Sequence, residues 1–393
     1  MNFNFNVPSK VIFENGCSIA VAEVIHEIQA KRVFIVYDKG IKSAGIADKI
    51  IAPVEKAGIK VTHFTGVHPN PSIENVEEGY KVAAVADTDA IIAIGGGSSM
   101  DCAKAINILL TNPGSIKDYE GRGKVKNKTK PLIAIPTTAG TGSEVTAFTI
   151  ITDTERQRKM IIAGENCGAD IALVDPALTI GLPPAITAAT GMDALTHAIE
   201  AFVSKNASIP SNIHALKAME LIVGNLEEAV KNGTNLKARG NMMLGSLLAG
   251  IAFNQAGLGL AHAIAHPLGS RFGVAHGVAN AIGLPYVVNY NSGLESVKEK
   301  HMEIASAMNI DTEKKSVDVI SEELVSTIVK LSSAIDIPAL RGLGITKEDL
   351  ENIAVEALKE NSMKFTPRNA SLEELKELLL SIYNEDPLIE KVY

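Results

Sequence analysis

Cysteine is scarce in this sequence, and there is no excess of positive charge. Three cysteines stand far apart among 393 residues without a CxxC pair, which argues against a disulfide framework or a thiolate metal site and indicates a reducing compartment. The net charge of -8, from 37 basic and 45 acidic residues, argues against a surface for nucleic acid or an anionic membrane. No basic start followed by an apolar stretch opens the chain, so we expect a cytoplasmic protein.

Apolar residues are plentiful, at 46% of the chain, which is enough to form a core and excludes a disordered protein. The length predicts two domains. One stretch without acidic or basic residues, 241–270, could suggest a membrane span. Its apolar part, 242–253, is too short for that and is followed by Asn, Gln and His side chains, so we predict a helix buried inside the protein and no membrane partner.

The first half of the chain alternates between short apolar runs and amphipathic segments of helical length. The runs are rich in β-branched residues and are bounded by Gly, Asp or Pro, as is typical of buried parallel strands joined by helices. The sequence therefore predicts an α/β domain with a Rossmann-like parallel sheet over residues 1–182. The expected strands are 33–37, 90–94, 132–135 and 171–174, and two of the expected helices are 73–85 and 99–110.

The second half loses these strand signals after about Asp175 and shows long Ala- and Leu-rich stretches with helical spacing. Two prolines, Pro183 and Pro184, separate the two patterns, so we predict an all-helical domain over 183–393. Thr346 with Asp349, and Ser371 with Glu374, have the spacing of capping boxes and predict two helix starts.

The clearest polar signal of the first half is the run from Gly95 to Ser99, between an expected strand and an expected helix. Glycines let the backbone approach a phosphate, and the N–H groups of a helix N-terminus favour negative charge. A second polar loop, 136–143, follows the next strand, and Asp38 ends an earlier one, where a carboxylate can accept hydrogen bonds from a ribose. The run is not GxGxxG, and a turn without a ligand stays an alternative.

The second half contains pairs of potential metal ligands one helical turn apart. Asp193 precedes His197 by four residues, and His262 precedes His266 by four in an apolar setting that favours neutral imidazole. His276 follows a glycine-bounded break. One carboxylate and three imidazoles can hold a divalent ion with a position left for substrate, although spacing leaves open which histidine is the spare. Buried core histidines without a metal are the alternative, and no GxSxG elbow supports a serine nucleophile.

Together, these segments resemble the iron-containing alcohol dehydrogenase family, also called the group III alcohol dehydrogenases, which includes lactaldehyde reductases and 1,3-propanediol and butanol dehydrogenases. The resemblance runs almost end to end. Its motifs are Asp38-Lys-Gly40, Pro69-Asn70-Pro71, the run from Gly95 to Asp101, the run from Pro136 to Thr146, Gly191-Met-Asp-Ala-Leu-Thr-His197, and the run from Gly259 to Gly269.

This resemblance implies an N-terminal dinucleotide-binding domain and a helical C-terminal domain, in a dehydroquinate synthase-like architecture with the active site in the cleft between them. It also implies a separate role for each of these histidines. Asp193, His197, His262 and His276 would ligate the metal, and His266 would stay unligated as the catalytic residue that relays a proton. The residues that it implies around the cofactor are Asp38, Asn70, Gly95, Gly96, Gly97, Ser98, Thr137, Thr138, Thr141 and Lys159.

We therefore expect an NAD(H)-dependent alcohol dehydrogenase or aldehyde reductase that acts on small primary alcohols, diols or hydroxyaldehydes. The expected metal is Fe²⁺, with Zn²⁺ as an alternative. NAD(H) is expected over NADP(H), because the carboxylate of Asp38 would repel a 2′-phosphate. We also expect a homo-oligomer. The alternatives are a glycerol dehydrogenase-like polyol oxidoreductase, a metal-dependent hydrolase and a nucleotide-binding protein without catalysis.

Overall fold

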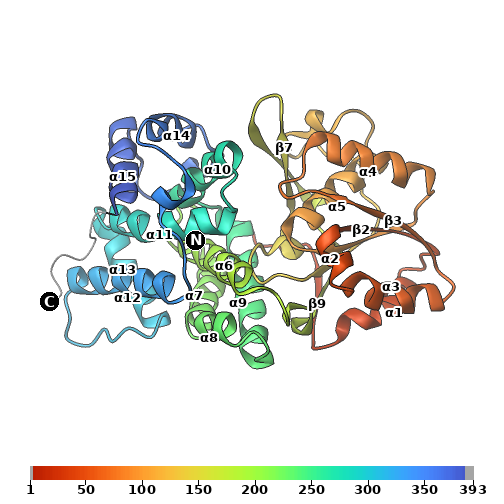
Figure 1. The fold of residues 1–393 in the computed structure, drawn as a ribbon, viewed down its shortest axis with the longest axis horizontal. Helices are drawn as coiled ribbons and strands as arrows, with labels where there is room; N and C mark the ends of the chain where they lie inside the picture. The colour runs from red at the N-terminus through yellow and green to blue at the C-terminus, as the bar shows by residue number, and fades with distance from the viewer. Residues whose placement is uncertain (1–2, 386–393) are drawn as a thin grey trace. The chain divides into compact units, whose positions relative to one another are not determined.

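The computed structural model describes residues 3–385 and divides the chain into two compact units. One unit spans Asn6–Ile180 and contains the strands. The other is helical and comprises the chain from Gly181 onward together with residues 3–5; Figure 1 colours the chain from red to blue along its length. The α/β domain followed by an all-helical domain is thus confirmed. Short 3₁₀ helices lie between the main elements: η1 (Cys17–Ala20), η2 (Ile116–Tyr119), η3 (Ser143–Val145), η4 (Glu165–Cys167), η5 (Pro176–Thr179), η6 (Leu340–Leu343) and η7 (Asn361–Lys364).

A six-stranded parallel sheet forms the centre of the first unit. The four predicted strands are present, and they are nearly fully buried, which explains their continuous apolar runs. Two further strands, which were not predicted, lie at the edges of the sheet, where most of their residues are exposed or partly exposed. In spatial order the strands are β1 (Lys10–Phe13), β9 (Ile171–Val174), β6 (Leu132–Pro136), β4 (Ala90–Gly95), β2 (Arg32–Asp38) and β3 (Lys60–Val67).

Both faces of this sheet are covered by helices, so successive residues of one strand enter different cores. In β2, Val33 and Ile35 join one core, whereas Phe34 joins the core on the opposite face. The first core contains residues of α1 (Val21–Glu27) and α3 (Ile46–Lys56), and the second contains residues of α4 (Ile73–Val85) and α5 (Gly97–Thr111). Helix α2 (Lys39–Ser43) is a short helix directly after β2.

A second, small sheet in the same unit was not predicted. Strands β7 (Phe148–Asp153) and β8 (Arg158–Ala163) form an antiparallel hairpin, and β5 (Gly121–Arg122) adds a short parallel edge to β8. The charged sequence around the hairpin turn, between Asp153 and Arg158, breaks the alternation of apolar and polar residues that indicates a strand. The hairpin contacts Asp101 on α5 and the carbonyl of Asn70.

The second unit is built from packed helices, and one apolar core in it joins residues between Leu260 and Ile382. The predicted buried helix lies within the long helix α9, most of whose residues are buried. No single described helix is long and apolar enough to cross a membrane; α9 and α10 pass such a test only as a pair, by length and composition, and they are bent by 104°. The helices are α6 (Pro184–Val203), α7 (Ile209–Val223), α8 (Leu226–Lys231), α9 (Leu236–Ala256), α10 (Leu260–Phe272), α11 (His276–Asn291), α12 (Glu295–Ala307), α13 (Val317–Ala334), α14 (Asp349–Ala357) and α15 (Leu372–Asn384).

One of the two predicted capping boxes forms. The Ser371 hydroxyl accepts from the Glu374 N–H at 3.2 Å, and the Glu374 carboxylate accepts from the Ser371 N–H at 2.8 Å, at the start of α15. The box at Thr346 is wrong, because α14 begins only at Asp349. There the Asp349 carboxylate accepts from both the N–H and the hydroxyl of Thr346, and the N-cap is Glu348, which makes no side-chain cap hydrogen bond.

Candidate functional site

Three predicted cofactor segments meet at the carboxyl ends of neighbouring strands. Strand β4 lies between β2 and β6, with Gly95 opposite Pro136 and Ala93 opposite Val36. After β2, the chain forms β3 on one side of β2 and then β4 on its other side. The direction in which strands are added therefore reverses between β2 and β4, which makes this place a topological switch point. Open α/β sheets bind ligands at such a point.

The glycine run forms a close turn into α5. Gly95 has a φ of 145°, and a Cβ atom there would lie 2.5 Å from the Ser99 hydroxyl oxygen. Gly96 is the N-cap of α5, and neither a capping side chain nor an acidic residue stands in this first turn. Cβ atoms on Gly96 and Gly97 would approach Thr138 and Thr141 to 3.1 and 2.9 Å. The glycine run and the threonine loop therefore touch, and they leave N–H groups suited to a phosphate.

Asn70 and Lys159 lie near the same loops. The Asn70 N–H donates to the Ser98 hydroxyl at 3.3 Å, and the Thr152 hydroxyl donates to the Asn70 carbonyl at 3.2 Å. Lys159 stands opposite Thr152 in the β7–β8 hairpin. Asn70 has a φ of 53°, a conformation that Asn tolerates better than most residues. Asn70 therefore joins the glycine run to the hairpin that carries Lys159.

Asp38 and Thr137 complete the predicted set. Asp38 ends β2 and caps α2, since its carboxylate accepts from the Ile41 N–H at 2.9 Å. Thr137 is buried, and its N–H donates to the Gly95 carbonyl at 3.0 Å. The structure thus gathers the predicted cofactor residues around one end of the sheet, and their contacts with a dinucleotide stay a prediction.

The predicted metal ligands come from three helices of the second unit. Asp193 and His197 lie one turn apart on α6, and His262 and His266 one turn apart on α10. His276 is the first residue of α11. Helix α10 ends at a Gly273 with a φ of 68°, which reverses the chain and returns it within three residues to the other histidines.

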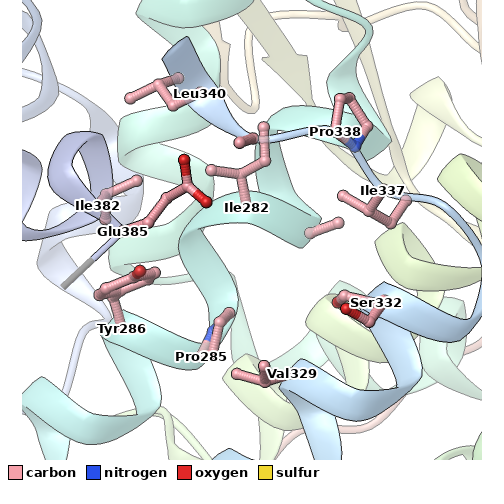
Figure 2. A pocket seen from close by; sticks show the side chains of 13 residues that line it. Ile282, Pro285, Tyr286, Val329, Ser332, Ile337, Pro338, Leu340, Ile382 and Glu385 are labelled. Carbon is pink, nitrogen blue, oxygen red and sulfur yellow. The ribbon is translucent and has the colours of Figure 1, made fainter. Parts of the chain in front are cut away.

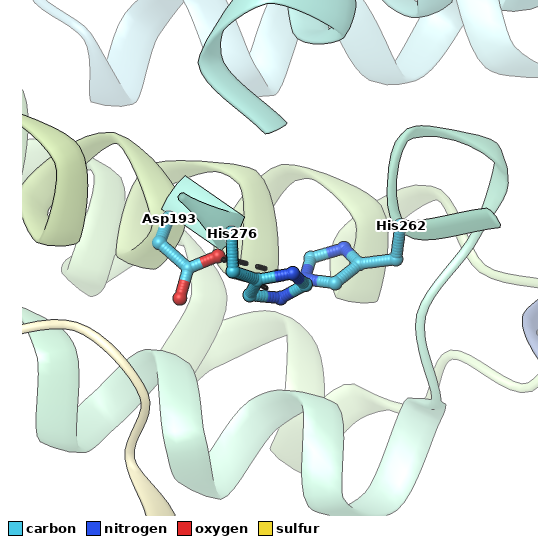
Figure 3. A group of neighbouring side chains, drawn as sticks. All are labelled: Asp193, His262 and His276. Atoms are coloured by element: carbon cyan, nitrogen blue, oxygen red, sulfur yellow. Dashed lines mark ion pairs between the residues drawn. The ribbon is translucent and has the colours of Figure 1, made fainter. Parts of the chain in front are cut away.

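Three of these side chains, Asp193, His262 and His276, point toward one another in Figure 3. Asp193 Oδ1 lies 3.7 Å from His262 Nε2 and 3.6 Å from His276 Nε2, and ligand atoms of these three residues all lie within 4.8 Å of one another. His197 Nε2 lies 3.9 Å from the same oxygen, and its ring stacks on that of His262 at 4.7 Å. Asp193, His197 and His262 are buried, whereas His276 is partly exposed.

The donor set fits a divalent cation. The amide nitrogen of Asn280 lies 2.7 Å from Asp193 Oδ1, 3.1 Å from His262 Nε2 and 3.3 Å from His276 Nε2. An N–H₂ group has two protons and cannot donate to all three atoms at once, but its closeness to each shows that the three atoms surround a common point. One carboxylate oxygen and imidazole nitrogens in this arrangement suit a first-row divalent metal. Which residues bind the metal stays a prediction.

Glu200 supports this cluster and was missed in the sequence. Its carboxylate accepts from His262 Nδ1 at 2.7 Å and from the N–H groups of Gly259 and Ala261 at 2.9 and 2.6 Å. Burial by itself would raise the pKa of Glu200, but these hydrogen bonds bring it below its ordinary value. Because Nδ1 of His262 carries the proton, its Nε2 presents a lone pair to the cluster.

His266, which is not one of the proposed metal ligands, also has its Nδ1 beside a glutamate carboxylate. Its Nδ1 lies 2.8 Å from a carboxylate oxygen of Glu360, a second residue that the sequence did not reveal. Its ring stacks on that of His276 at 5.6 Å. With Nδ1 donating to Glu360, Nε2 of His266 is the nitrogen that can exchange a proton with another group.

Replacing Gly277 with alanine is expected to destabilise the protein by about 3 kcal/mol. A Cβ atom there would lie 2.1 Å from the carbonyl oxygen of Ala189 on α6, and backbone cannot move aside as a flexible side chain can. Gly283→Ala on the same helix is the control, because its Cβ would meet nothing within 4 Å. Urea unfolding measures both. Equal stability of the two variants would show that α6 and α11 do not need this close approach.

A separate hollow of about 400 Å³ lies elsewhere in the helical unit (Figure 2). It is lined mainly by apolar side chains, among them Ile282, Pro285 and Ile337. Among the described residues that line it, Glu385 is the one carboxylate, and there is no histidine. This hollow therefore offers no set of metal donors comparable with that around Asp193.

Comparison with known proteins finds the same family along nearly the whole chain. The model of the iron-containing alcohol dehydrogenases matches residues 8–176, and the C-terminal model of the same family matches residues 187–383. A 1,3-propanediol dehydrogenase of Citrobacter freundii is 40% identical, covering 96% of this chain and 97% of that protein. An NAD-dependent methanol dehydrogenase of Bacillus methanolicus is 35% identical, covering 96% and 98%.

The fold gives the same result. The crystal structure of a 1,3-propanediol oxidoreductase superimposes with a TM-score of 0.94 at 40% identity, covering 97% of this chain and all of that one. Both halves of the chain and nearly its whole length are therefore accounted for by one family. The chain belongs to the iron-containing alcohol dehydrogenases and is an oxidoreductase of alcohols and aldehydes.

Proposed function

We propose that this enzyme transfers hydride between NAD(H) and small primary alcohols, diols or hydroxyaldehydes, with Fe²⁺ bound by Asp193, His197, His262 and His276. The observation that carries the proposal is the convergence of Asp193, His262 and His276 on one point in a largely buried setting. The 1,3-propanediol and methanol dehydrogenases among its relatives support small alcohols as substrates.

A cation held there would supply a Lewis acid for the substrate oxygen. The chain's own contribution is the charge and geometry of the donors. One carboxylate and three neutral imidazoles leave a bound divalent ion with net positive charge. Glu200 keeps His262 in the tautomer whose Nε2 lone pair is available.

His266 is the proposed proton carrier. Glu360 orients its ring through Nδ1, so Nε2 can accept the proton from an alcohol or return it to the product of reduction. Because His266 is 6% exposed, few waters can compete for this nitrogen. Its stacking with His276 fixes it beside the proposed metal ligands.

The first unit would bind the dinucleotide, which supplies or takes the hydride. The N–H groups at the start of α5 would receive its pyrophosphate, and the contact between the glycine run and the threonine loop would shape the pocket. Asp38 would accept hydrogen bonds from the adenosine ribose. The NAD-dependent methanol dehydrogenase relative supports NAD over NADP.

Replacing Asp38 with serine is expected to raise the ratio of kcat/KM for NADPH to that for NADH at least about tenfold, because one repulsive charge beside a phosphate is removed. Serine is chosen because it can still cap α2, as Asp38 does for the Ile41 N–H. Steady-state kinetics with both cofactors measure the ratio. An unchanged ratio would mean that Asp38 does not discriminate between them.

Elemental analysis of anaerobically purified protein, combined with NADH consumption on a panel of short aldehydes, tests the proposal. We expect about one iron per chain and NADH oxidation with two- to four-carbon aldehydes. Zinc in place of iron would overturn the metal assignment. A metal-loaded protein that neither binds nor oxidises NADH would contradict the proposed reaction and favour a hydrolase.

A further inference from the structure

Lys104 is a lysine in the middle of α5 that is 1% exposed. Lysine is almost never fully buried unless its ammonium group is paired. Here the nitrogen lies 2.6–3.2 Å from five oxygen atoms of described residues, all of them on one stretch of chain. They are the carbonyl and hydroxyl oxygens of Ser143, the carbonyl and hydroxyl oxygens of Thr146, and the carbonyl oxygen of Phe148.

Asp101, one turn before Lys104, strengthens the same connection. Its carboxylate accepts from the Ser143 hydroxyl at 2.8 Å and from the Ile150 N–H at 3.1 Å, and its carbonyl accepts from the Thr149 hydroxyl at 2.7 Å. The Ser143 hydroxyl donates its proton to Asp101, and its oxygen accepts a hydrogen bond from the Lys104 ammonium group. An ammonium and a carboxylate from one helix face thus hold the segment from Ser143 to Ile150 at two points.

The two segments so joined are the two loops of the proposed cofactor site. Helix α5 begins at Gly97, directly after the glycine run, and Ser143 follows the loop that contains Thr138 and Thr141. At the other end of both segments, Gly97 and Thr141 are in such close contact that a Cβ on Gly97 would lie 2.9 Å from the Thr141 side chain. Lys104 therefore joins the same two segments at a second place.

We propose that Lys104 is a positioning residue for the dinucleotide: it does not contact the cofactor but fixes the spacing between the glycine run and the threonine loop. This inference rests on the proposed function, since it assumes that both loops bind NAD(H). Burial lowers the pKa of Lys104, and the nearby carboxylates of Asp101 and Glu144 oppose this change. The contacts are to backbone carbonyls in three of five cases, so a residue without a donor would leave buried acceptors unpaired.

The test replaces Lys104 with methionine and measures NADH binding by fluorescence. We expect the Kd for NADH to rise at least about tenfold, because hydrogen bonds from a charged donor are lost. The Kd for added Zn²⁺ should stay within about twofold, because the proposed metal ligands belong to the other unit. Lys130→Met is the matched control: this half-buried lysine donates to the Thr88 carbonyl before β4, far along the strands from both loops, and its loss should leave NADH binding unchanged.

A second pair of variants applies if Lys104→Met does not fold. Thr146→Val removes the hydroxyl that Lys104 contacts and keeps the volume, whereas Thr146→Ser keeps the hydroxyl. We expect the Kd for NADH to rise about fivefold in Thr146→Val and to stay close to the wild-type value in Thr146→Ser. Equal NADH affinities of Lys104→Met and Lys130→Met, or of the two Thr146 variants, would overturn the inference. Wild-type protein that does not bind NADH would instead contradict the proposed function.

Discussion

Asp193→Ala is expected to lose its metal on purification and to reduce aldehydes at least about a thousandfold more slowly than the wild type, since a Lewis acid contributes several kcal/mol to such a reaction. Asp193 Oδ1 lies within 4 Å of Nε2 in each of His197, His262 and His276. Without it the cluster would hold only neutral donors. Metal content by mass spectrometry and NADH oxidation with a short aldehyde measure the two effects.

Thr196→Val is the control for this variant. Thr196 is buried on the same helix, and its hydroxyl donates to the Met192 carbonyl within the helix, so valine keeps its volume and breaks no contact with the cluster. We expect it to retain metal and activity. NADH should still bind to Asp193→Ala, because the predicted cofactor residues lie in the other unit. Full metal content and full activity in Asp193→Ala would refute the proposed centre.

The sequence predicted those parts of the fold whose signal is local. Strands β2, β4, β6 and β9 are buried on both faces, so their apolar runs are continuous, and α4 has the predicted bounds of 73–85. The edge strand β3 has several partly exposed residues, and the β7–β8 hairpin turns through charged residues. These exposed and charged residues interrupt the apolar runs, which explains why periodicity did not reveal either element.

The same distinction holds for the site. The spacing of Asp193 with His197 indicated a common helix face, and α6 confirms that arrangement. Glu200 could have been found, because it and Asp193 are the only charged residues of a helix that is buried along most of its length, and a buried carboxylate needs a partner. Glu360 could not, since 94 positions separate it from His266 and no local pattern connects them.

Glu200→Gln is expected to weaken metal binding about 10- to 100-fold, the usual effect of losing the group that orients a ligating histidine. Glu200 accepts three N–H groups with two oxygens, one from His262 and two from the start of α10. An amide has only one oxygen. If its N–H₂ faces His262, the imidazole must move its proton to Nε2 and loses the lone pair that the metal needs; if it faces Ala261, two donors oppose each other at the helix start.

Glu360→Gln separates this effect from a general consequence of losing a carboxylate. Glu360 also accepts from an imidazole Nδ1, but that of His266, which is not among the proposed ligands. Competition with a chromophoric chelator at fixed pH measures the metal Kd of both variants, after circular dichroism has shown that each is folded. We expect Glu360→Gln to bind Zn²⁺ within about twofold of the wild type, because the ring nitrogen that it orients is not a donor to the metal. If instead the two variants bind the ion equally well, then the orientation of His262 does not depend on Glu200, and the hydrogen bonds of that carboxylate serve only to anchor α10.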